Sequence, residues 1–182
     1  MDLLQQKKEL RQLIRQRKNE YTSEYLTTLS VPILSVVETM PVFQESEIVL
    51  AYWAMPDEVQ TQLLIKKWAG CKQFYLPVVV NNDLEFRLFD NEASLEARGK
   101  YGILEPTGAL LPADAHVDLI LVPGVAFNEL GDRLGHGRGY YDRALSHYPD
   151  AYKLGLAFGF QMMDEIPVEP HDQRMTGVVS GQ

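Results

Sequence analysis

Residues 117–143 carry the most information in this chain and read VDLILVPGVAFNELGDRLGHGRGYYDR. They begin with its clearest apolar run, Val117–Val122, whose length and β-branched residues are typical of a buried strand. A long loop follows, in which glycine occupies every second position from 135 to 139, and a helix is predicted to begin near Tyr140. A strand, a loop and a helix in this order indicate an α/β fold.

The rest of the chain alternates between helical and strand patterns. Helices are predicted over residues 2–21, from Ser23 to just before Pro41, and over 59–69, and Pro32 could divide the second into two short helices. Strands are predicted over Ile48–Ala54, Phe74–Val80, Leu84–Phe89 and Tyr152–Phe158. This alternation predicts a three-layer α/β/α sandwich with a mostly parallel, Rossmann-like sheet. We expect residues 1–182 to form a single domain.

Composition limits the function classes. A formal charge of −8 argues against a general nucleic-acid-binding protein, which needs a basic face. No apolar run is long enough to span a membrane and no signal peptide is recognisable, so we expect a cytoplasmic protein. We also expect a monomer. The single cysteine, Cys71, has no adjacent base and is expected in the core rather than as a nucleophile. The four histidines lack metal-ligand spacing, so no zinc site is predicted.

The first predicted helix carries two stripes of side chains. At about 100° per residue, one stripe is apolar except for Arg17 and comprises Leu3, Leu10, Leu13, Ile14 and Tyr21. The other is basic and comprises Lys7, Arg11, Arg15 and Lys18. These charges are either a solvated helix face, the usual case, or the border of an anion-binding site.

The glycine-rich segment has the layout of a phosphate-binding loop. Glycines permit backbone conformations in which main-chain N–H groups converge on an anion, and the following helix adds its own N–H groups. The spacing matches neither the Walker loop nor the dinucleotide fingerprint, so a flexible turn without a ligand is the alternative. Arg133 and Arg138 favour the anion site, because a simple turn needs no positive charge.

Three carboxylates are candidates for chemistry. Asp142 lies in the first turn of the predicted helix, where it either complements the helix dipole or holds magnesium beside bound phosphates. Asp172 is a second candidate ligand, or an ordinary acid of a surface turn. Glu58 follows Tyr52 and Trp53 near a strand end, a combination that suits a flat heterocycle with N–H donors or simply a helix start beside core aromatics. Tyr101 is either a further wall of that site or a loop anchor.

Five segments, taken together, resemble the 5-formyltetrahydrofolate cyclo-ligase family over nearly the whole chain. The segment Pro123–Arg143 is highly specific, and the others are individually weak but occur in the right order. These others are Lys7-Lys8-Glu9-Leu10-Arg11, Met55-Pro56-Asp57-Glu58 with Thr61, Tyr101-Gly102-Ile103-Leu104-Glu105-Pro106, and Pro170-His171-Asp172.

The resemblance implies an ATP- and Mg²⁺-dependent cyclisation of 5-formyltetrahydrofolate to 5,10-methenyltetrahydrofolate, with ADP and phosphate released. The ATP-binding residues it implies are Lys7, Lys8, Arg11, Arg133, Leu134, Gly135, His136, Gly137, Arg138, Gly139, Tyr140 and Tyr141. The implied folate contacts are Tyr52, Trp53, Met55, Glu58 and Tyr101 together with His136, Gly137, Arg138, Gly139 and Tyr140, and the implied metal ligands are Asp142 and Asp172.

The sequence departs from the family pattern at Thr176, where many relatives carry an acid, and at His136 and Arg138, which fall at variable positions. Two other functions are considered. One is a phosphosugar-binding α/β enzyme, which would leave Glu58 and its aromatic neighbours unexplained. The other is a folate-binding protein without turnover, which would have no use for a phosphate loop.

Overall fold

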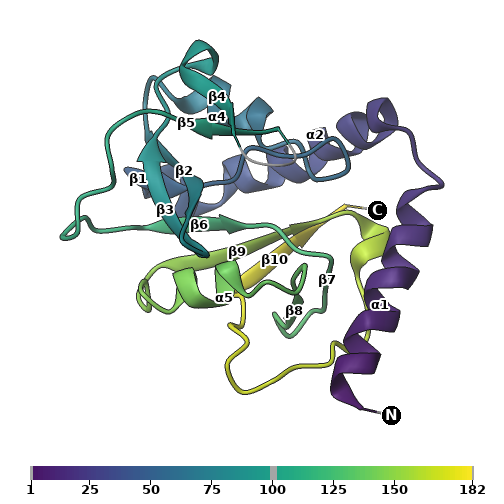
Figure 1. Cartoon of the computed structure of the whole chain (residues 1–182). Helices are drawn as coiled ribbons and strands as arrows, with labels where there is room; N and C mark the ends of the chain where they lie inside the picture. Colours follow the sequence, from purple (N-terminus) through teal and green to yellow (C-terminus); the bar gives the residue numbers. More distant parts are fainter. Residues whose placement is uncertain (1, 99–101, 182) are drawn as a thin grey trace.

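The computed structural model describes residues 2–98 and 102–181, so Tyr101 lies outside the described part. A six-stranded sheet in the order β10-β9-β6-β1-β2-β3 forms its centre (Figure 1). The strands are β1 (Ile48–Leu50), β2 (Gln73–Val80), β3 (Asp83–Leu88), β6 (Leu119–Val122), β9 (Tyr152–Ala157) and β10 (Gly177–Ser180). All neighbouring strands are parallel except β2 and β3, which pair antiparallel. The predicted mostly parallel sheet is confirmed.

The two faces of the sheet are covered by different helices. Alternate residues of β6, such as Leu119 and Leu121, pack with α2 (Ser23–Thr39), α3 (Pro41–Glu45) and α4 (Gln62–Trp68) on one face. Ile120 and Val122 point the other way, toward α5 (Tyr140–Leu145). Because a strand presents successive side chains to opposite faces, a strand that is apolar throughout must be covered on both. The three-layer prediction is therefore confirmed.

The first helix, α1 (Leu3–Lys18), lies to one side of the sheet beside a small hairpin (Figure 1). This hairpin pairs β7 (Ala126–Phe127) with β8 (Arg133–Leu134) and folds the long loop after β6 back on itself. Ile14 of α1 is fully buried against Ala126 and Leu134 of the hairpin. The packing places the basic stripe of α1 next to the glycine-rich segment.

The other small elements lie between β3 and β6 and after β9. A second hairpin pairs β4 (Leu95–Arg98) with β5 (Ile103–Pro106), and single 3₁₀ turns cover Glu92–Ser94 and Gly159–Gln161. The sequence patterns predicted neither hairpin nor β10, because these strands are short and, unlike the equally short β1 and β6, do not lie within a longer apolar run. In the described part of the chain, no helix has both the length and the apolar character needed to cross a membrane.

Two predictions about helices were wrong. Pro32 does not divide α2, which is continuous from Ser23 to Thr39. Pro32 and Thr28 lie on the exposed face, so the carbonyl group that loses its helical donor can be hydrated. Leu13, expected in the apolar stripe of α1, is 37% exposed, because α1 packs along one side only.

Two further predictions also need correction. β1 ends at Leu50, four residues earlier than expected. Ala51 still donates its N–H to the carbonyl of Tyr75 in β2, but the carbonyl group of Tyr52 accepts a hydrogen bond from the side chain of Thr61. Cys71 is exposed rather than buried in the core. It lies between α4 and β2, at a turn that keeps its side chain outside.

Candidate active site

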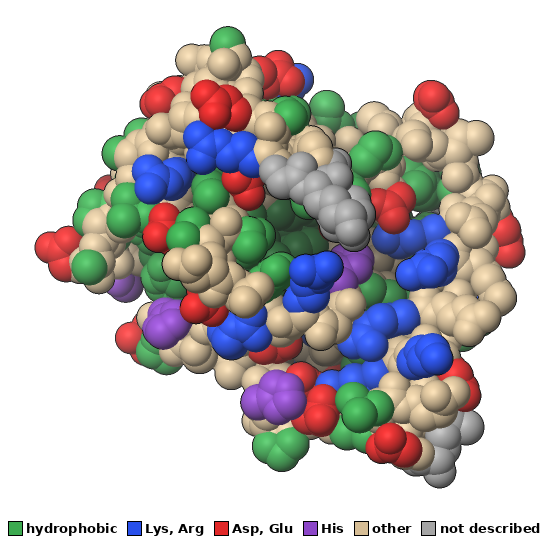
Figure 2. Space-filling model, in the orientation of Figure 1, with side chains coloured by type: hydrophobic (Ala, Val, Ile, Leu, Met, Phe, Trp, Pro, Cys, Tyr) green, Lys and Arg blue, Asp and Glu red, His purple; other side chains and the backbone are tan. Residues whose placement is uncertain are grey.

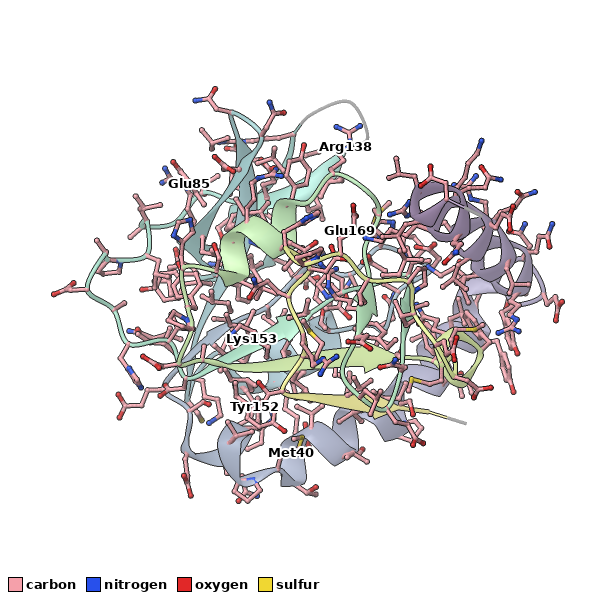
Figure 3. All side chains as sticks on the ribbon, turned by 90° about the horizontal axis from the view of Figure 1, so that it is seen from below. Met40, Glu85, Arg138, Tyr152, Lys153 and Glu169 are labelled. Carbon is pink, nitrogen blue, oxygen red and sulfur yellow. The ribbon has the colours of Figure 1, made fainter. Side chains whose placement is uncertain are left out.

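A cavity of about 250 Å³ lies between α1, the glycine-rich segment and the segment before β10. Lys and Arg side chains gather around this hollow on the α1 side of the molecule (Figure 2). Seventeen residues line the cavity: Leu4, Lys7, Arg11, Pro123, all of 133–142, Glu169, His171 and Asp172. Arg138 and Glu169 lie toward the same end of the molecule, and Met40 and Tyr152 toward the other (Figure 3). Pro123, which directly follows β6, lines the cavity, so the cavity lies beyond the carboxyl end of that strand, where ligands bind in open α/β sheets.

The predicted phosphate-binding residues come together here, with one exception. All of those in α1 and in the segment 133–141 line the cavity except Lys8. Lys8 is exposed on the outer side of α1, one position round the helix from Lys7. Within the basic stripe of α1, Lys7 and Arg11 face the cavity, whereas Arg15 is exposed and fits the solvated-face alternative.

The glycine-rich segment has the backbone geometry that its glycines predict at two of three positions. Gly137 and Gly139 have φ angles of +104° and +69°, in the left-handed region that favours glycine. Gly135 has no positive φ, but a Cβ atom there would lie 3.0 Å from Nη1 of Arg133, so a larger residue would require this buried side chain to shift. The helix that follows, α5, begins at Tyr140 as predicted.

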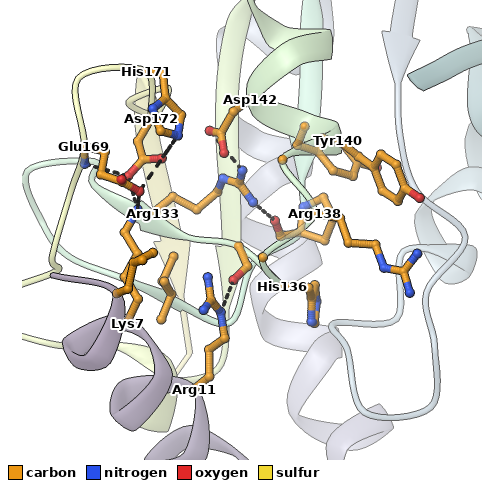
Figure 4. A pocket seen from close by; sticks show the side chains of 17 residues that line it. Lys7, Arg11, Arg133, His136, Arg138, Tyr140, Asp142, Glu169, His171 and Asp172 are labelled. Carbon is orange, nitrogen blue, oxygen red and sulfur yellow. Dashed lines mark hydrogen bonds and ion pairs between the residues drawn. The ribbon is translucent and has the colours of Figure 1, made fainter. Parts of the chain in front are cut away.

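Arg133 is a buried guanidinium group that connects β6 to α5. It donates to the carbonyl of Pro123 at 3.0 Å and to Oδ1 of Asp142 at 3.2 Å, while its Nε has no hydrogen-bond partner among the described residues (Figure 4). The main-chain N–H of Gln173 also donates to Oδ1 of Asp142, at 2.9 Å. Arg133 therefore positions Asp142 as well as contributing positive charge to the cavity.

Lys7 is almost buried and lies between two carboxylates. Its Nζ is 2.7 Å from Glu169 and 2.6 Å from Asp172 (Figure 4). Burial alone would raise the pKa of Asp172, but the hydrogen bond from Lys7, the N–H of Glu169 and the charge of Lys7 outweigh it and lower this pKa. Burial likewise lowers the pKa of Lys7, and the two acids more than reverse this effect.

Sequence reasoning assigned no site role to four residues that line the cavity, Leu4, Pro123, Glu169 and His171, and Glu169 is the one that forms an ion pair with a predicted site residue. It is separated from Lys7 by 162 positions, and an acid beside Pro170 carries no signal of a distant basic partner. The only available clue was its place three residues before Asp172, whose carboxylate accepts the N–H of Glu169 at 2.8 Å.

The loop that carries Glu58 meets the glycine-rich segment. Oε1 of Glu58 is 4.0 Å from Nε2 of His136, and its Oε2 accepts the N–H of Met55 at 2.8 Å. Lys18 of α1 holds the same loop through an ion pair of 3.0 Å with Asp57. The two regions singled out in the sequence therefore adjoin.

The apolar residues near Glu58 that were predicted to contact a ligand differ in their exposure to solvent. Tyr52 is only 4% exposed, and its hydroxyl donates to the carbonyl of Val59 at 3.3 Å, so its ring belongs to the core. Trp53 is partly buried and stacks on Phe89 with ring centres 5.4 Å apart. Met55 is 44% exposed. Trp53 and Met55 are thus better placed than Tyr52 to contact a ligand.

Burial raises the pKa of Glu58 from 4.5 to about 7. A carboxyl group with a raised pKa binds its proton more tightly in the folded state, so its contribution to stability is present below about pH 4.5 and lost as the pH rises through about 7. We expect the free energy of unfolding, compared with that of Glu58→Gln, to fall by at most about 3 kcal/mol between pH 4.5 and 8.

Denaturant unfolding at a series of pH values measures this difference. Glu45→Gln is the control, because Glu45 is exposed and its variant should follow the wild type. Parallel curves for Glu58→Gln and the wild type would contradict the assignment.

The carboxylates of the cavity fit a magnesium ion by their chemistry. Mg²⁺ in nucleotide sites is held by one or two carboxylates with substrate phosphates completing its shell, and Asp142 and Asp172 line the same cavity as the glycines. Ligand atoms of Glu169, His171 and Asp172 also lie within 4.8 Å of one another. Thr176 has a structural role instead. Its hydroxyl accepts a hydrogen bond from the N–H of Lys153 at 3.0 Å and so connects the start of β10 to β9.

Comparison with known proteins identifies the family of this chain. The model of the 5-formyltetrahydrofolate cyclo-ligase family matches residues 4–181. The 5-formyltetrahydrofolate cyclo-ligase of Escherichia coli K12 is 31% identical, over 92% of this chain and 96% of that protein. The solved structure of 5,10-methenyltetrahydrofolate synthetase from Aquifex aeolicus is 32% identical over 96% of this chain and 89% of its own, with a TM-score of 0.84. The chain belongs to the 5-formyltetrahydrofolate cyclo-ligase family and is therefore a ligase.

Proposed function

We propose that this protein converts 5-formyltetrahydrofolate and ATP into 5,10-methenyltetrahydrofolate, ADP and phosphate, with Mg²⁺ as the metal. The observation that carries the proposal is the cavity itself, which combines the glycine-rich segment, basic side chains from two elements and carboxylates suited to a metal. The contact between His136 and Glu58 adds a second region beside it, where a folate ring would lie next to the phosphates.

The chemistry explains why ATP is needed. The formyl oxygen of the substrate resembles an amide oxygen and is a very poor leaving group. When it attacks the γ-phosphorus of ATP, an O–P bond forms, the bond to the bridging oxygen breaks and ADP leaves. N10 of the folate then attacks the formyl carbon, the N10 proton is lost, and phosphate departs with the oxygen as the ring closes. No covalent enzyme intermediate is required, so catalysis consists of positioning and charge stabilisation.

The side chains of the cavity would divide this work. Lys7, Arg11 and Arg133 would bind the phosphates, aided by the main-chain N–H groups of 135–139. Asp142 and Asp172 would hold Mg²⁺, which when bound supplies positive charge to the phosphate oxygens. Because α5 has only six residues, the main-chain amides of the loop matter more here than the helix dipole.

The folate ring would contact the second region. The carboxylate of Glu58 would accept hydrogen bonds from the N–H groups of the pterin. Trp53 would provide an apolar surface beside the ring. His136, Gly137, Arg138, Gly139 and Tyr140 line the cavity and would border both substrates. We infer a folate contact for Met55, which is exposed, whereas the buried Tyr52 would act only by packing beneath this region.

A coupled assay tests the proposed function. Purified protein with ATP, Mg²⁺ and 5-formyltetrahydrofolate should produce the absorbance of the methenyl product and one ADP per product molecule. Folate binding without turnover would support the folate-binding alternative. Turnover without nucleotide would contradict the role of ATP.

Arg11→Ala is expected chiefly to raise the KM for ATP. Nε of Arg11 donates to the carbonyl of Gly135 at 2.9 Å, so this side chain both carries charge into the cavity and holds the loop. Loss of one charge-assisted hydrogen bond should cost about tenfold in KM. Steady-state kinetics with Arg15→Ala as control measures this, since Arg15 is exposed on the same helix. An unchanged KM would return Arg11 to the solvated-face interpretation.

A further inference from the structure

Arg143 of α5 contacts both the distant turn at residues 82–83 and the glycine-rich segment that directly precedes its own helix. Its Nε is 3.0 Å from Oδ1 of Asp83, and its Nη2 donates to the carbonyl of Asn82 at 2.6 Å. Its Nη1 donates to the carbonyl of Arg138 at 3.0 Å. The guanidinium also lies over the ring of Tyr140, 5.6 Å from its centre. One side chain therefore connects the turn between β2 and β3 to the end of the glycine-rich segment.

The turn at residues 81–83 is a firm support for this contact. Asn81 and Asn82 both have positive φ, 48° and 67°, as in the tight turns that match the twist of a β-hairpin. β2 and β3 pair from Tyr75–Leu88 to Val80–Asp83, directly up to the turn. A carbonyl and a carboxylate at the end of this hairpin thus hold two of the three donor positions of Arg143.

The third bond determines how the glycine-rich segment presents its amides. In a planar trans peptide, the C=O of one residue and the N–H of the next point in opposite directions. The carbonyl of Arg138 is directed at Arg143, so the N–H of Gly139 is directed away from it. Gly139 lines the cavity, whereas Arg143 does not belong to the described residues that line it. Arg143 therefore approaches Gly139 from outside the cavity. The bond from Arg143 therefore favours an amide that faces the cavity.

The opposite end of the segment is held in a comparable way. Arg11 donates to the carbonyl of Gly135 from α1, so guanidinium groups of two different helices bind the carbonyls at 135 and 138. Space is limited on the Arg143 side, because a Cβ atom at Gly139 would lie 2.8 Å from Nη1 of Arg143. Two fixed carbonyls restrict the rotation of the peptides between them, which lowers the entropy lost when an anion binds.

We propose that Arg143 is a positioning residue for nucleotide binding, which directs the Gly139 amide toward the phosphates through the carbonyl of Arg138. This inference rests on the proposed function, since it assumes that a nucleotide occupies the cavity. Arg143 itself does not touch the substrate. Its effect should therefore appear in nucleotide affinity and not in folate affinity.

Four variants test the proposal by calorimetric titration with Mg²⁺ and a non-hydrolysable ATP analogue. Arg143→Ala should bind the analogue about tenfold more weakly, with the folate Kd unchanged within about twofold. The affinity of Arg143→Lys for the analogue should lie between those of the wild type and Arg143→Ala, because an ammonium group can replace only some of the hydrogen bonds of the planar guanidinium group. Asp83→Asn should stay within about twofold of the wild type, since it leaves both carbonyl bonds in place.

Arg98→Ala is the matched control. Its side chain is 49% exposed and pairs with Glu96 at 2.9 Å, whereas that of Arg143 is 48% exposed. Both alanine variants should have similar Tm values, so a difference in nucleotide affinity would not reflect a general loss of stability. The amide resonance of Gly139 provides a direct readout, because its shift on nucleotide addition should be smaller in Arg143→Ala.

The outcomes separate this inference from the proposed function. If the wild type binds the analogue and Arg143→Ala binds it equally well, the positioning role is wrong while the proposed function stands. An equal loss of nucleotide and folate affinity would also overturn the positioning role. If the wild type binds no analogue at all, the proposed function fails first.

Discussion

Asp142→Asn is expected to lower kcat by about 10²–10³-fold while the folate Kd changes by no more than about twofold. The substitution removes the negative charge that is assigned to Mg²⁺ and that accepts Nη2 of Arg133 and the N–H of Gln173. A metal ligand acts on the transferring phosphoryl group, so its loss should affect turnover more than ground-state binding of folate. Single-turnover kinetics and a separate folate titration measure the two effects.

The same substitution leaves Arg133 buried without its ion-pair partner, which provides an internal check. A buried charge without a partner is strongly destabilising, whereas removal of both charges is often tolerated. The double variant Arg133→Met with Asp142→Asn should therefore regain part of the lost stability without regaining turnover. Asp114→Asn, in an exposed position before β6, is the control and should behave as the wild type. Equal losses of turnover and folate affinity would contradict the metal role.

Lys7→Met should produce the largest combined effect on stability and nucleotide binding. The Lys7 side chain is 8% exposed, and those of its partners Asp172 and Glu169 are 10% and 29% exposed. Its loss removes the lysine from two neighbouring carboxylates and leaves them only the exposed His171 as a basic neighbour. We expect a cost of about 2–3 kcal/mol in the free energy of unfolding, less than for a fully buried pair because Glu169 is partly accessible. Affinity for ATP should fall at least about tenfold, because a positive charge at the phosphates is replaced by uncompensated negative charge.

Lys8→Met is the matched control, since the exposed neighbour offers the same substitution without the ion pairs. The pH dependence of the free energy of unfolding also tests whether Lys7 stabilises the charged form of Asp172. The lowered pKa of Asp172 means that its contribution to stability is present above the ordinary pKa of an aspartate and lost as the pH falls through the lower, folded value. This acid-dependent loss should be smaller in Lys7→Met than in the wild type. Identical stabilities of Lys7→Met and Lys8→Met would show that the ion pairs contribute nothing.

Long apolar segments of the sequence were sufficient to predict the central architecture. β2, β3, β6 and β9 lie within one or two residues of the predicted runs. β6 is apolar along its whole length because it is buried on both faces, whereas in the edge strand β3 the apolar residues Leu84, Phe86 and Leu88 alternate with polar ones. Short elements escaped prediction: β7 and β8 have two residues each, too few for any periodic signal. The continuity of α2 through Pro32 was also missed, since it depends on which face of the helix meets water.

The candidate site divides in the same way. The glycine-rich segment, the basic residues of α1, and Asp142 could be identified from residue type and spacing, because an anion site needs particular chemistry at neighbouring positions. The partners could not. Glu169 pairs with Lys7, Arg143 with Asp83, and His136 approaches Glu58 across separations that no local pattern records.

The amino-acid sequence by itself thus determined the fold class, the family resemblance and the residue types available for phosphate and metal chemistry, because hydrophobic periodicity and local motifs act over a few residues. Only the tertiary structure decided which charges neutralise one another, which face of α1 meets the cavity and how the carbonyls of the glycine-rich segment are held. These depend on distances between segments far apart in the chain, and electrostatic and hydrogen-bond energies change steeply with distance and burial.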